Sequence, residues 1–156
     1  VQHVGVAVGS EAVAVHVHRG LAGEDFGYVG HAVLTHEVTA VTAAGMLVRA
    51  NAFCATGGFD EENLRVAYND VDLCLKLRDA GWKIIQCNEF VAVHHESVSR
   101  GSDDQEEHEA RFFAESRFIQ EKWSDHPLFC RDPAYSRFFA VDRLSYHDLQ
   151  DPLSAP

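Results

Sequence analysis

Small and apolar residues alternate in two short stretches near the start of the chain. Val4 to Val8 alternates valine with small residues, and Val13 to Val17 repeats the pattern. A period of two places successive side chains on opposite faces, which is typical of a strand. The pattern predicts two strands, followed by an irregular, glycine-punctuated segment from Gly20 to His36.

The next apolar stretch, Val38 to Val48, is rich in β-branched and small residues. It predicts a buried strand pair, or a bent strand with Gly45 at the bend. A glycine at this place lets a ligand or another part of the backbone approach closely. Residues 49–56 predict a short helix that Gly57 and Gly58 end, because glycine adopts a left-handed helix cap at least cost.

A helical period follows the next polar loop. Its apolar positions are Val71, Cys74, Leu75 and Leu77. Asn69 or Asp70 would cap this helix, because their side-chain oxygens can accept hydrogen bonds from the amides of the first turn. The pair Ala80 and Gly81 would end it.

Two more strands and a long helix complete the pattern. Residues 82–87 predict a strand, residues 90–93 a more buried strand, and residues 106–123 a helix. The inward positions of this helix would be Ala110, Phe113, Phe118 or Ile119, and Trp123. Strands and helices in this order predict an α/β or α+β fold, with a mixed β-sheet flanked by helices.

Length and charge narrow the class of protein. The 156 residues fit one domain, and 46% hydrophobic content is enough for a sizeable core. A formal net charge of -11 disfavours nucleic acid and anionic membrane surfaces as partners. Neither an apolar run of about 18 residues nor a signal-peptide pattern is visible. The abrupt apolar start without Met predicts an excised fragment.

The cysteines show no metal-binding spacing. They are Cys54, Cys74, Cys87 and Cys130, without a Cys-x-x-Cys pair. This pattern predicts reduced and mostly buried thiols in a cytosolic protein.

Chemistry concentrates between the glycine pair and the central helix, where Asp70 and Asp72 follow Asn69. Loop carboxylates at a helix start are well placed to act on a ligand, although capping alone would explain them. Four motifs stand in order along the chain. They are Gly57-Gly58-Phe59-Asp60-Glu61, then Asn69-Asp70-Val71-Asp72-Leu73-Cys74-Leu75-Lys76-Leu77, then Ala80-Gly81-Trp82-Lys83-Ile84, and finally Val93-His94-His95-Glu96-Ser97-Val98-Ser99-Arg100-Gly101.

Together these motifs resemble the second half of a family 2 glycosyltransferase of the GT-A type, from Val1 to about Tyr135. The resemblance implies the C-terminal, acceptor-side half of a nucleotide-diphospho-sugar transferase fold over residues 1–135, with an irregular tail over 136–156. It implies inverting transfer of a sugar from a nucleotide-diphosphate donor to the hydroxyl of a saccharide or lipid-linked acceptor. The setting would be cell-surface polysaccharide biosynthesis in the cytoplasm, at the inner face of the membrane through the full-length protein.

The resemblance also assigns roles to residues. Asp70, the second residue of the Asn-Asp pair, would be the catalytic base. A divalent metal, Mg²⁺ or Mn²⁺, would neutralise the leaving diphosphate, with His94 as a ligand and His95 in reserve. The remaining residues expected to meet substrate are Gly45, Gly58, Phe59, Asp60, Glu61, Asn69, Asp72 and Arg100.

One departure limits what this chain could do by itself. No Asp-x-Asp precedes the central stretch, so the main metal-binding pair and the nucleotide-binding units would lie in a missing N-terminal half. The isolated chain is therefore expected to be inactive. Two other interpretations stay open: a metal-dependent hydrolase built on the aspartates with His16, His18, His94 and His95, or a non-catalytic saccharide-binding module.

Overall fold

The computed structural model describes residues 7–8, 14–15, 25–90, 105–130 and 132–136. Its elements in chain order are β1 (Ala7–Val8), β2 (Ala14–Val15), the 3-10 helix η1 (Tyr28–Gly30), β3 (His36–Val38), α1 (Ala50–Ala55), α2 (Asn69–Asp79), β4 (Ile84–Gln86), α3 (Gln105–Trp123) and α4 (Pro127–Cys130). Among these residues, no helix is both long and apolar enough to cross a membrane.

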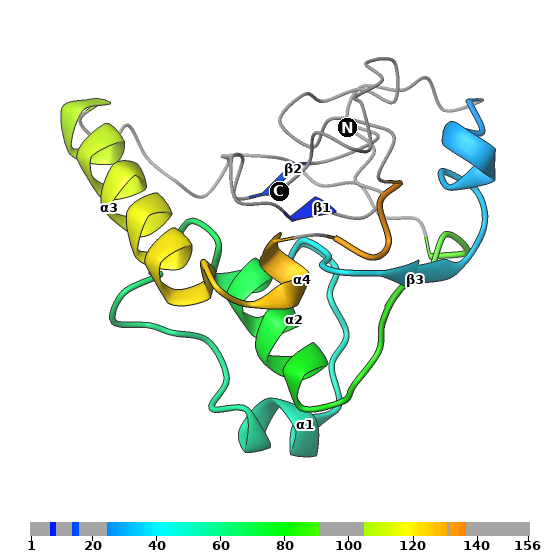
Figure 1. Ribbon diagram of the computed structural model, residues 1–156, viewed down its shortest axis with the longest axis horizontal. Helices are drawn as coiled ribbons and strands as arrows, with labels where there is room; N and C mark the ends of the chain where they lie inside the picture. The colour runs from blue at the N-terminus through cyan, green and yellow to red at the C-terminus, as the bar shows by residue number, and fades with distance from the viewer. Residues whose placement is uncertain (1–6, 9–13, 16–24, 91–104, 131, 137–156) are drawn as a thin grey trace.

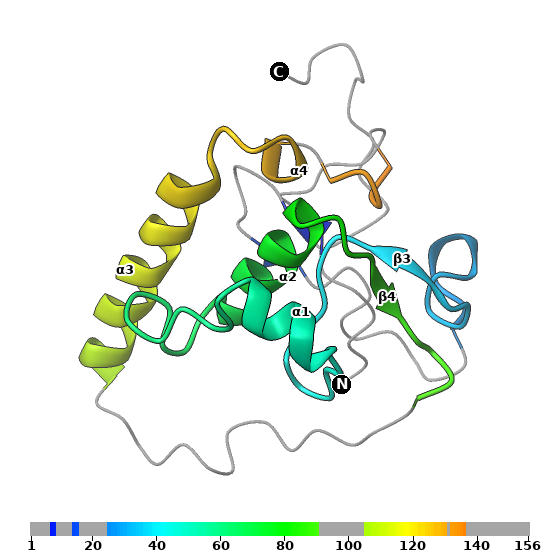
Figure 2. The ribbon, with the colours of Figure 1, turned by 90° about the horizontal axis from the view of Figure 1, so that it is seen from below.

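Helix α2 is the centre of the described structure. It lies between α1, α3, α4 and the β3–β4 pair (Figures 1 and 2). Apolar side chains point from it in several directions, so it is buried nearly all round and not only along one stripe. Its buried apolar residues are Val71, Leu73, Cys74, Leu75 and Leu77.

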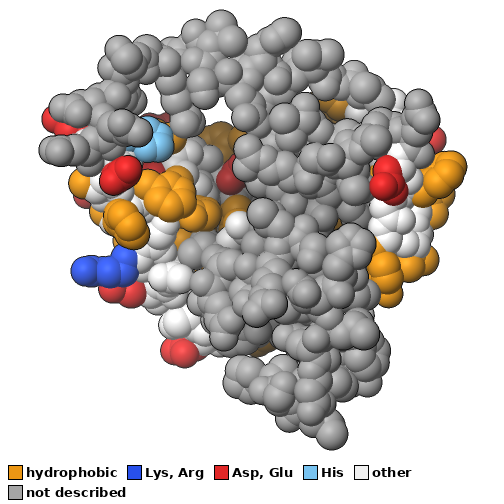
Figure 3. All heavy atoms as spheres, turned by 90° about the horizontal axis from the view of Figure 1, so that it is seen from above, with side chains coloured by type: hydrophobic (Ala, Val, Ile, Leu, Met, Phe, Trp, Pro, Cys, Tyr) orange, Lys and Arg blue, Asp and Glu red, His pale blue; other side chains and the backbone are white. Residues whose placement is uncertain are grey.

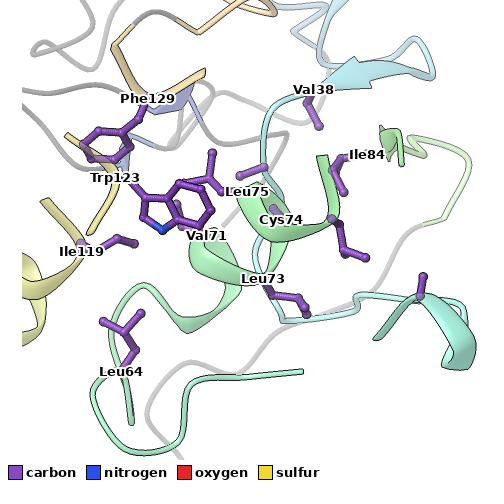
Figure 4. Packing of buried hydrophobic residues seen from close by; sticks show 13 residues of the cluster. Val38, Leu64, Val71, Leu73, Cys74, Leu75, Ile84, Ile119, Trp123 and Phe129 are labelled. Carbon is purple, nitrogen blue, oxygen red and sulfur yellow. The ribbon is translucent and has the colours of Figure 1, made fainter. Parts of the chain in front are cut away.

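The core forms where the end of α3 and the helix α4 meet α2. Ile119, Trp123 and Phe129 pack against the apolar side chains of α2, and Leu64 closes the core from the preceding loop (Figure 4). Each of these side chains contributes about 1.5–3 kcal/mol through burial. The prediction of a helix ending at Trp123 is confirmed. Its predicted inward face is wrong at its N-terminal half, because Phe113 is 71% exposed.

The strands form two small antiparallel pairs in the described part of the chain. β1 pairs with β2, and β3 pairs with β4 with Val38 opposite Ile84. The predicted strands near the start are confirmed at Ala7–Val8 and Ala14–Val15, the described parts of those stretches, and the strand predicted at 82–87 is confirmed over Ile84–Gln86. The expected strand over 38–48 is wrong beyond Val38, because the chain turns there and does not extend. The expected mixed sheet is not formed by the described residues.

Two other expectations differ from the structure. Phe90 lies outside any strand and is 63% exposed, while residues 91–93 of the same predicted strand lie outside the described residues. Cys74 is buried as expected, but Cys54 and Cys87 are exposed. Residues 137–156 of the expected tail also lie outside the described residues, and the segment after Pro127 begins with a short helix.

Candidate active site

Asp70 lies in the first turn of α2, beside a turn formed by residues 43–46. One of its carboxylate oxygens accepts a hydrogen bond from the N–H of Ala43 at 2.9 Å, and the other accepts one from Val71 at 2.9 Å. The turn is closed by the N–H of Met46 on the carbonyl of Ala43. Asp70 is half-buried. Its carboxylate therefore has a fixed orientation while remaining accessible.

The expected cap of α2 is wrong in its position. The N-cap residue is Tyr68, whose side chain makes no capping hydrogen bond, while the Asp70 carboxylate accepts one from the first-turn amide of Val71. Tyr68 takes φ 62° and ψ 5°, a left-handed conformation that is uncommon for a residue other than glycine. Strained residues of this kind cluster at functional sites, where surrounding contacts hold them in place. Here the strain falls directly before Asn69 and Asp70.

Gly45 belongs to the turn that Asp70 holds, so the structure brings these two predicted site residues together. Gly45 is exposed and takes φ 85°. A Cβ atom at this position would lie 3.3 Å from the Cε1 atom of Phe90. The close approach expected at Gly45 is thus made by an aromatic ring, the last described side chain before His94 and His95.

A second group of predicted site residues lines an open depression on the surface. Phe59, Glu61 and Asn69 surround it together with Leu64 and Arg65, and its volume is about 360 Å³. An aromatic ring beside carboxylate, amide and guanidinium groups offers both an apolar face and hydrogen-bonding groups to a polar ligand. Asn69 lines the depression and directly precedes Asp70, whose carboxylate faces the turn at Ala43.

Asp72 does not face either place. It is fully buried, and its carboxylate lies 2.8 Å from Nζ of Lys122 and 3.0 Å from Nζ of Lys76. The indole N–H of Trp123 donates to the same carboxylate at 2.9 Å. Each carboxylate oxygen thus lies within 3.0 Å of a lysine ammonium group in the interior of the protein. The expectation that Asp72 contacts substrate is therefore corrected: it stabilises the packing of α2 against α3.

Gly58 and Asp60 fix the loop between α1 and α2. Gly58 is buried, its carbonyl accepts a hydrogen bond from Lys76, and a Cβ there would lie 2.7 Å from the Phe53 ring. This burial gives Gly58 a structural role in place of the expected contact with substrate. Burial raises the pKa of Asp60, but hydrogen bonds from Asn63 and the charge of Lys122 lower it by more, so its pKa lies below the usual value.

The Cys74 thiol lies on the inner side of α2, where it is buried away from water. Burial, countered in part by its hydrogen bond to Val41 and reinforced by the charge of Asp70, raises its pKa to about 12. A thiol with this pKa is inert at neutral pH. Cys74 is therefore not a candidate nucleophile at this end of α2.

The predicted metal ligands His94 and His95, and the predicted substrate residue Arg100, lie outside the described residues, as do His16 and His18. Within the described part of the chain, no three side chains of His, Cys, Asp or Glu gather in a way that could hold a metal ion. Asp72 cannot serve as a ligand while two lysines occupy it. The residues described here therefore do not by themselves fit a metal site.

Several residues that shape the site could not be recognised from motifs. They are Tyr68, Lys76, Glu115 and Lys122, with Leu64 and Arg65 in the depression. One signal was present in the sequence: Glu115, Ile119 and Lys122 share a helix face at spacings of four and three. Polar residues on the same face as a core residue indicate polar contacts with the body of the protein.

Comparisons with known proteins place the chain inside much longer relatives. It is 40% identical over 146 residues to the uncharacterized protein y4gI of Sinorhizobium fredii, covering 94% of this chain and 16% of that protein. It is 36% identical over 107 residues to the O-antigen biosynthesis protein RfbC of Myxococcus xanthus, covering 66% of this chain and 8% of that protein. The chain thus spans less than one fifth of the length of either relative.

Two other searches gave no match. No model of a protein family matches the chain, and no solved structure matches it.

Proposed function

We propose that this chain is the acceptor-side, catalytic half of an inverting GT-A glycosyltransferase that acts in cell-surface polysaccharide biosynthesis. The observation that carries the proposal is the position of Asp70, a half-buried carboxylate that the Ala43 amide orients and that follows Asn69, a residue of the depression, at the start of α2. The relative named as an O-antigen biosynthesis protein supports the same class of pathway.

In the proposed reaction, Asp70 accepts the proton of an acceptor hydroxyl as the oxygen attacks the anomeric carbon of the donor sugar. The new glycosidic bond forms as the bond to the diphosphate breaks on the opposite side, so the configuration inverts. The two hydrogen bonds from Ala43 and Val71 orient the carboxylate before substrate arrives. Phe59, Glu61 and Asn69 would hold the saccharide in the depression.

A divalent cation, Mg²⁺ or Mn²⁺, belongs to the proposal as the group that neutralises the leaving diphosphate. His94, or its neighbour His95, is the side chain of this chain proposed to contribute to it, and the other ligands would come from the N-terminal half of the domain. Arg100 is proposed to contact the donor phosphates. The nucleotide sugar, the acceptor and the N-terminal half are the proposed partners.

The test is sugar transfer by the full-length protein with a panel of nucleotide sugars and Mn²⁺. Replacing Asp70→Asn should lower kcat by at least about 100-fold while donor binding is kept. Asp79→Asn is the matched control, because it also replaces an aspartate of α2 with asparagine, but at the exposed C-terminal end of the helix. Equal activity of the Asp70→Asn protein and the wild type would contradict the proposal.

A binding measurement separates the alternatives. By calorimetry, the isolated chain should bind nucleotide diphosphates with Mn²⁺ no more tightly than about millimolar Kd, because the nucleotide-binding units lie elsewhere. Free saccharides that bind the chain without nucleotide, with Asp70→Asn leaving their binding unchanged, would instead identify a saccharide-binding module. Zinc retained through dialysis would favour a hydrolase.

A further inference from the structure

Glu115 of α3 is a buried carboxylate with an unusual set of partners. It is 4% exposed, and its oxygens accept hydrogen bonds from the backbone N–H groups of Arg65, Val66 and Ala67 at 3.1, 3.2 and 2.6 Å. Burying a carboxylate is unfavourable unless its oxygens are bonded. Three successive amides that converge on one charged group fix the backbone of residues 65–67.

The next residue along the chain is the strained Tyr68, which α3 also holds. The hydroxyl of Ser116 donates to the Tyr68 hydroxyl at 3.3 Å, and the rings of Tyr68 and Phe112 lie 5.6 Å apart between centroids. Phe112, Glu115 and Ser116 lie on one face of α3. Figure 2 shows the segment between α1 and α2 passing beside α3.

Tyr68 is the N-cap of α2, so its left-handed conformation sets the direction in which Asn69 and Asp70 leave the loop. Asp70 then reaches the amide of Ala43. A loop free to relax Tyr68 into an ordinary conformation would turn the first residues of α2 and move the Asp70 carboxylate away from Ala43.

We propose that Glu115 is a positioning residue that holds the Asp70 carboxylate in place through the backbone of residues 65–68. It deepens the proposed function and rests on it, because Asp70 is the proposed base. The other end of the same loop is held independently, since Lys122 of α3 lies 3.6 Å from the Asp60 carboxylate. Helix α3 thus fixes the site loop at both ends.

The test compares Glu115→Gln with Glu121→Gln in the full-length protein. Both changes remove one carboxylate from α3, but Glu121 is an exposed residue paired with Arg117. Hydrogen–deuterium exchange is followed in peptides covering 41–46 and 65–68, with 82–87 as the reference. Glutamine cannot accept three N–H bonds, because its amide NH₂ is itself a donor.

With Glu115→Gln, exchange should rise about tenfold in 65–68 and also in 41–46, where the Ala43 amide reports on Asp70. Exchange in 82–87, and in every peptide of Glu121→Gln, should stay unchanged. A rise confined to 65–68, or no rise, overturns the proposal. If Glu115→Gln does not fold, Glu115→Asp is measured instead. Aspartate keeps the negative charge, but its shorter side chain brings the carboxylate less close to the three amides. Exchange in peptides 41–46 and 65–68 then tests the proposal by the same criteria.

Kinetics distinguish this inference from the proposed function. If the full-length protein transfers sugar, Glu115→Gln should lower kcat by about 10- to 100-fold with little change in KM. An unchanged kcat overturns the positioning role. If the wild type transfers no sugar while exchange in 41–46 still responds to Glu115→Gln, the coupling between Glu115 and Asp70 stands and the proposed function fails.

Discussion

The two sides of the first turn of α2 each carry an aspartate, and their surroundings differ. Asp72 faces the core and is paired with two lysines and an indole N–H. Asp70 points away, about 200° around the helix. Within the described part of the chain, no lysine or arginine pairs with Asp70, and backbone amides alone bind it.

This difference gives Asp72 a structural role and leaves Asp70 as the candidate for a role in catalysis. Asp72 is fully buried beside two lysine ammonium groups, so its carboxylate is not accessible to a ligand. Backbone amides orient the Asp70 carboxylate without supplying a compensating formal charge. A general base needs a fixed position and an uncompensated carboxylate, and the role proposed for Asp70 rests on this difference.

Exposed hydrophobic side chains lie on the surface on either side of the site. Hydrophobic side chains gather at two separate places on one face of the molecule, on the side of α3 and on the side of β3 (Figure 3). The exposed residues include Phe112 and Phe113 on α3, and Phe26, Val29 and Leu34 before β3.

The largest predicted effect comes from Asp72→Asn. It leaves the Lys76 and Lys122 ammonium groups facing a neutral amide in a buried place, so the free energy of unfolding should fall by about 3–5 kcal/mol. Asp70→Asn should change it by less than about 1 kcal/mol, because that side is accessible to water. Urea denaturation measures both. Equal losses would remove the distinction between the two carboxylates.

A smaller effect is predicted for the glycine pair that precedes the site loop. Gly58→Ala should lower the free energy of unfolding by about 2–4 kcal/mol, because φ is 64° and the new Cβ meets the Phe53 ring. Gly57→Ala should cost only about 1 kcal/mol, because φ is 79° but no atom lies within 4 Å of its Cβ.

The same pair tests the extent of the Asp72 network. The Gly58 carbonyl is bound by Lys76, which also pairs with Asp72. The losses from Gly58→Ala and Asp72→Asn should therefore not add in the double variant. Gly57→Ala and Asp72→Asn should be additive, because Gly57 has no contact with the network among the interactions found. Urea denaturation of the two double variants gives the comparison.

The helices were predictable because local signals and tertiary packing agree there. The apolar period of 71–77 and the glycines at 57 and 58 defined α2 and the end of α1 within a residue or two. The stretch 38–48 has the composition of a strand, but it forms a turn at Gly45 that Asp70 holds from α2. Composition reports local preference and does not reveal a partner that is distant in the sequence.

The site was predictable in its residue types and only partly in its roles. By residue type and position near the start of a helix, Asp70 and Asp72 are equivalent, and only the family resemblance gave them different roles. Their difference arises from Trp123 and Lys122, about 50 residues later, which reach one of them and not the other. The role of Tyr68 depends on its backbone conformation, and the role of Glu115 depends on hydrogen bonds from three backbone amides. A sequence motif does not reveal either feature.

The smallest predicted effect concerns pH and Asp60, which joins the Asp72 side through Lys122. The pKa of Asp60 is lowered in the folded protein. Its ionised form therefore stabilises the fold above the unfolded value near about 3.9, and this contribution is lost as the pH falls through the folded value. The contribution should be less than about 1 kcal/mol, because Lys122 and Asp60 are both partly exposed.

Urea denaturation of the wild type and of Asp60→Asn between pH 7 and pH 3 measures how much the ionised Asp60 contributes to the free energy of unfolding. The wild type should be the more stable protein at pH 7, and the difference should shrink only below about pH 4. Glu37, whose pKa is lowered mainly by its hydrogen bond to Lys83, is present in both proteins and cancels. A difference that stays constant to pH 3 would contradict this prediction, because protonation of Asp60 should weaken both its ion pair with Lys122 and the hydrogen bonds from Asn63 that favour its charged form. The ion pair between Asp60 and Lys122 would then contribute nothing to stability, and the hydrogen bonds from three backbone amides to Glu115 would hold the site loop against α3 without it.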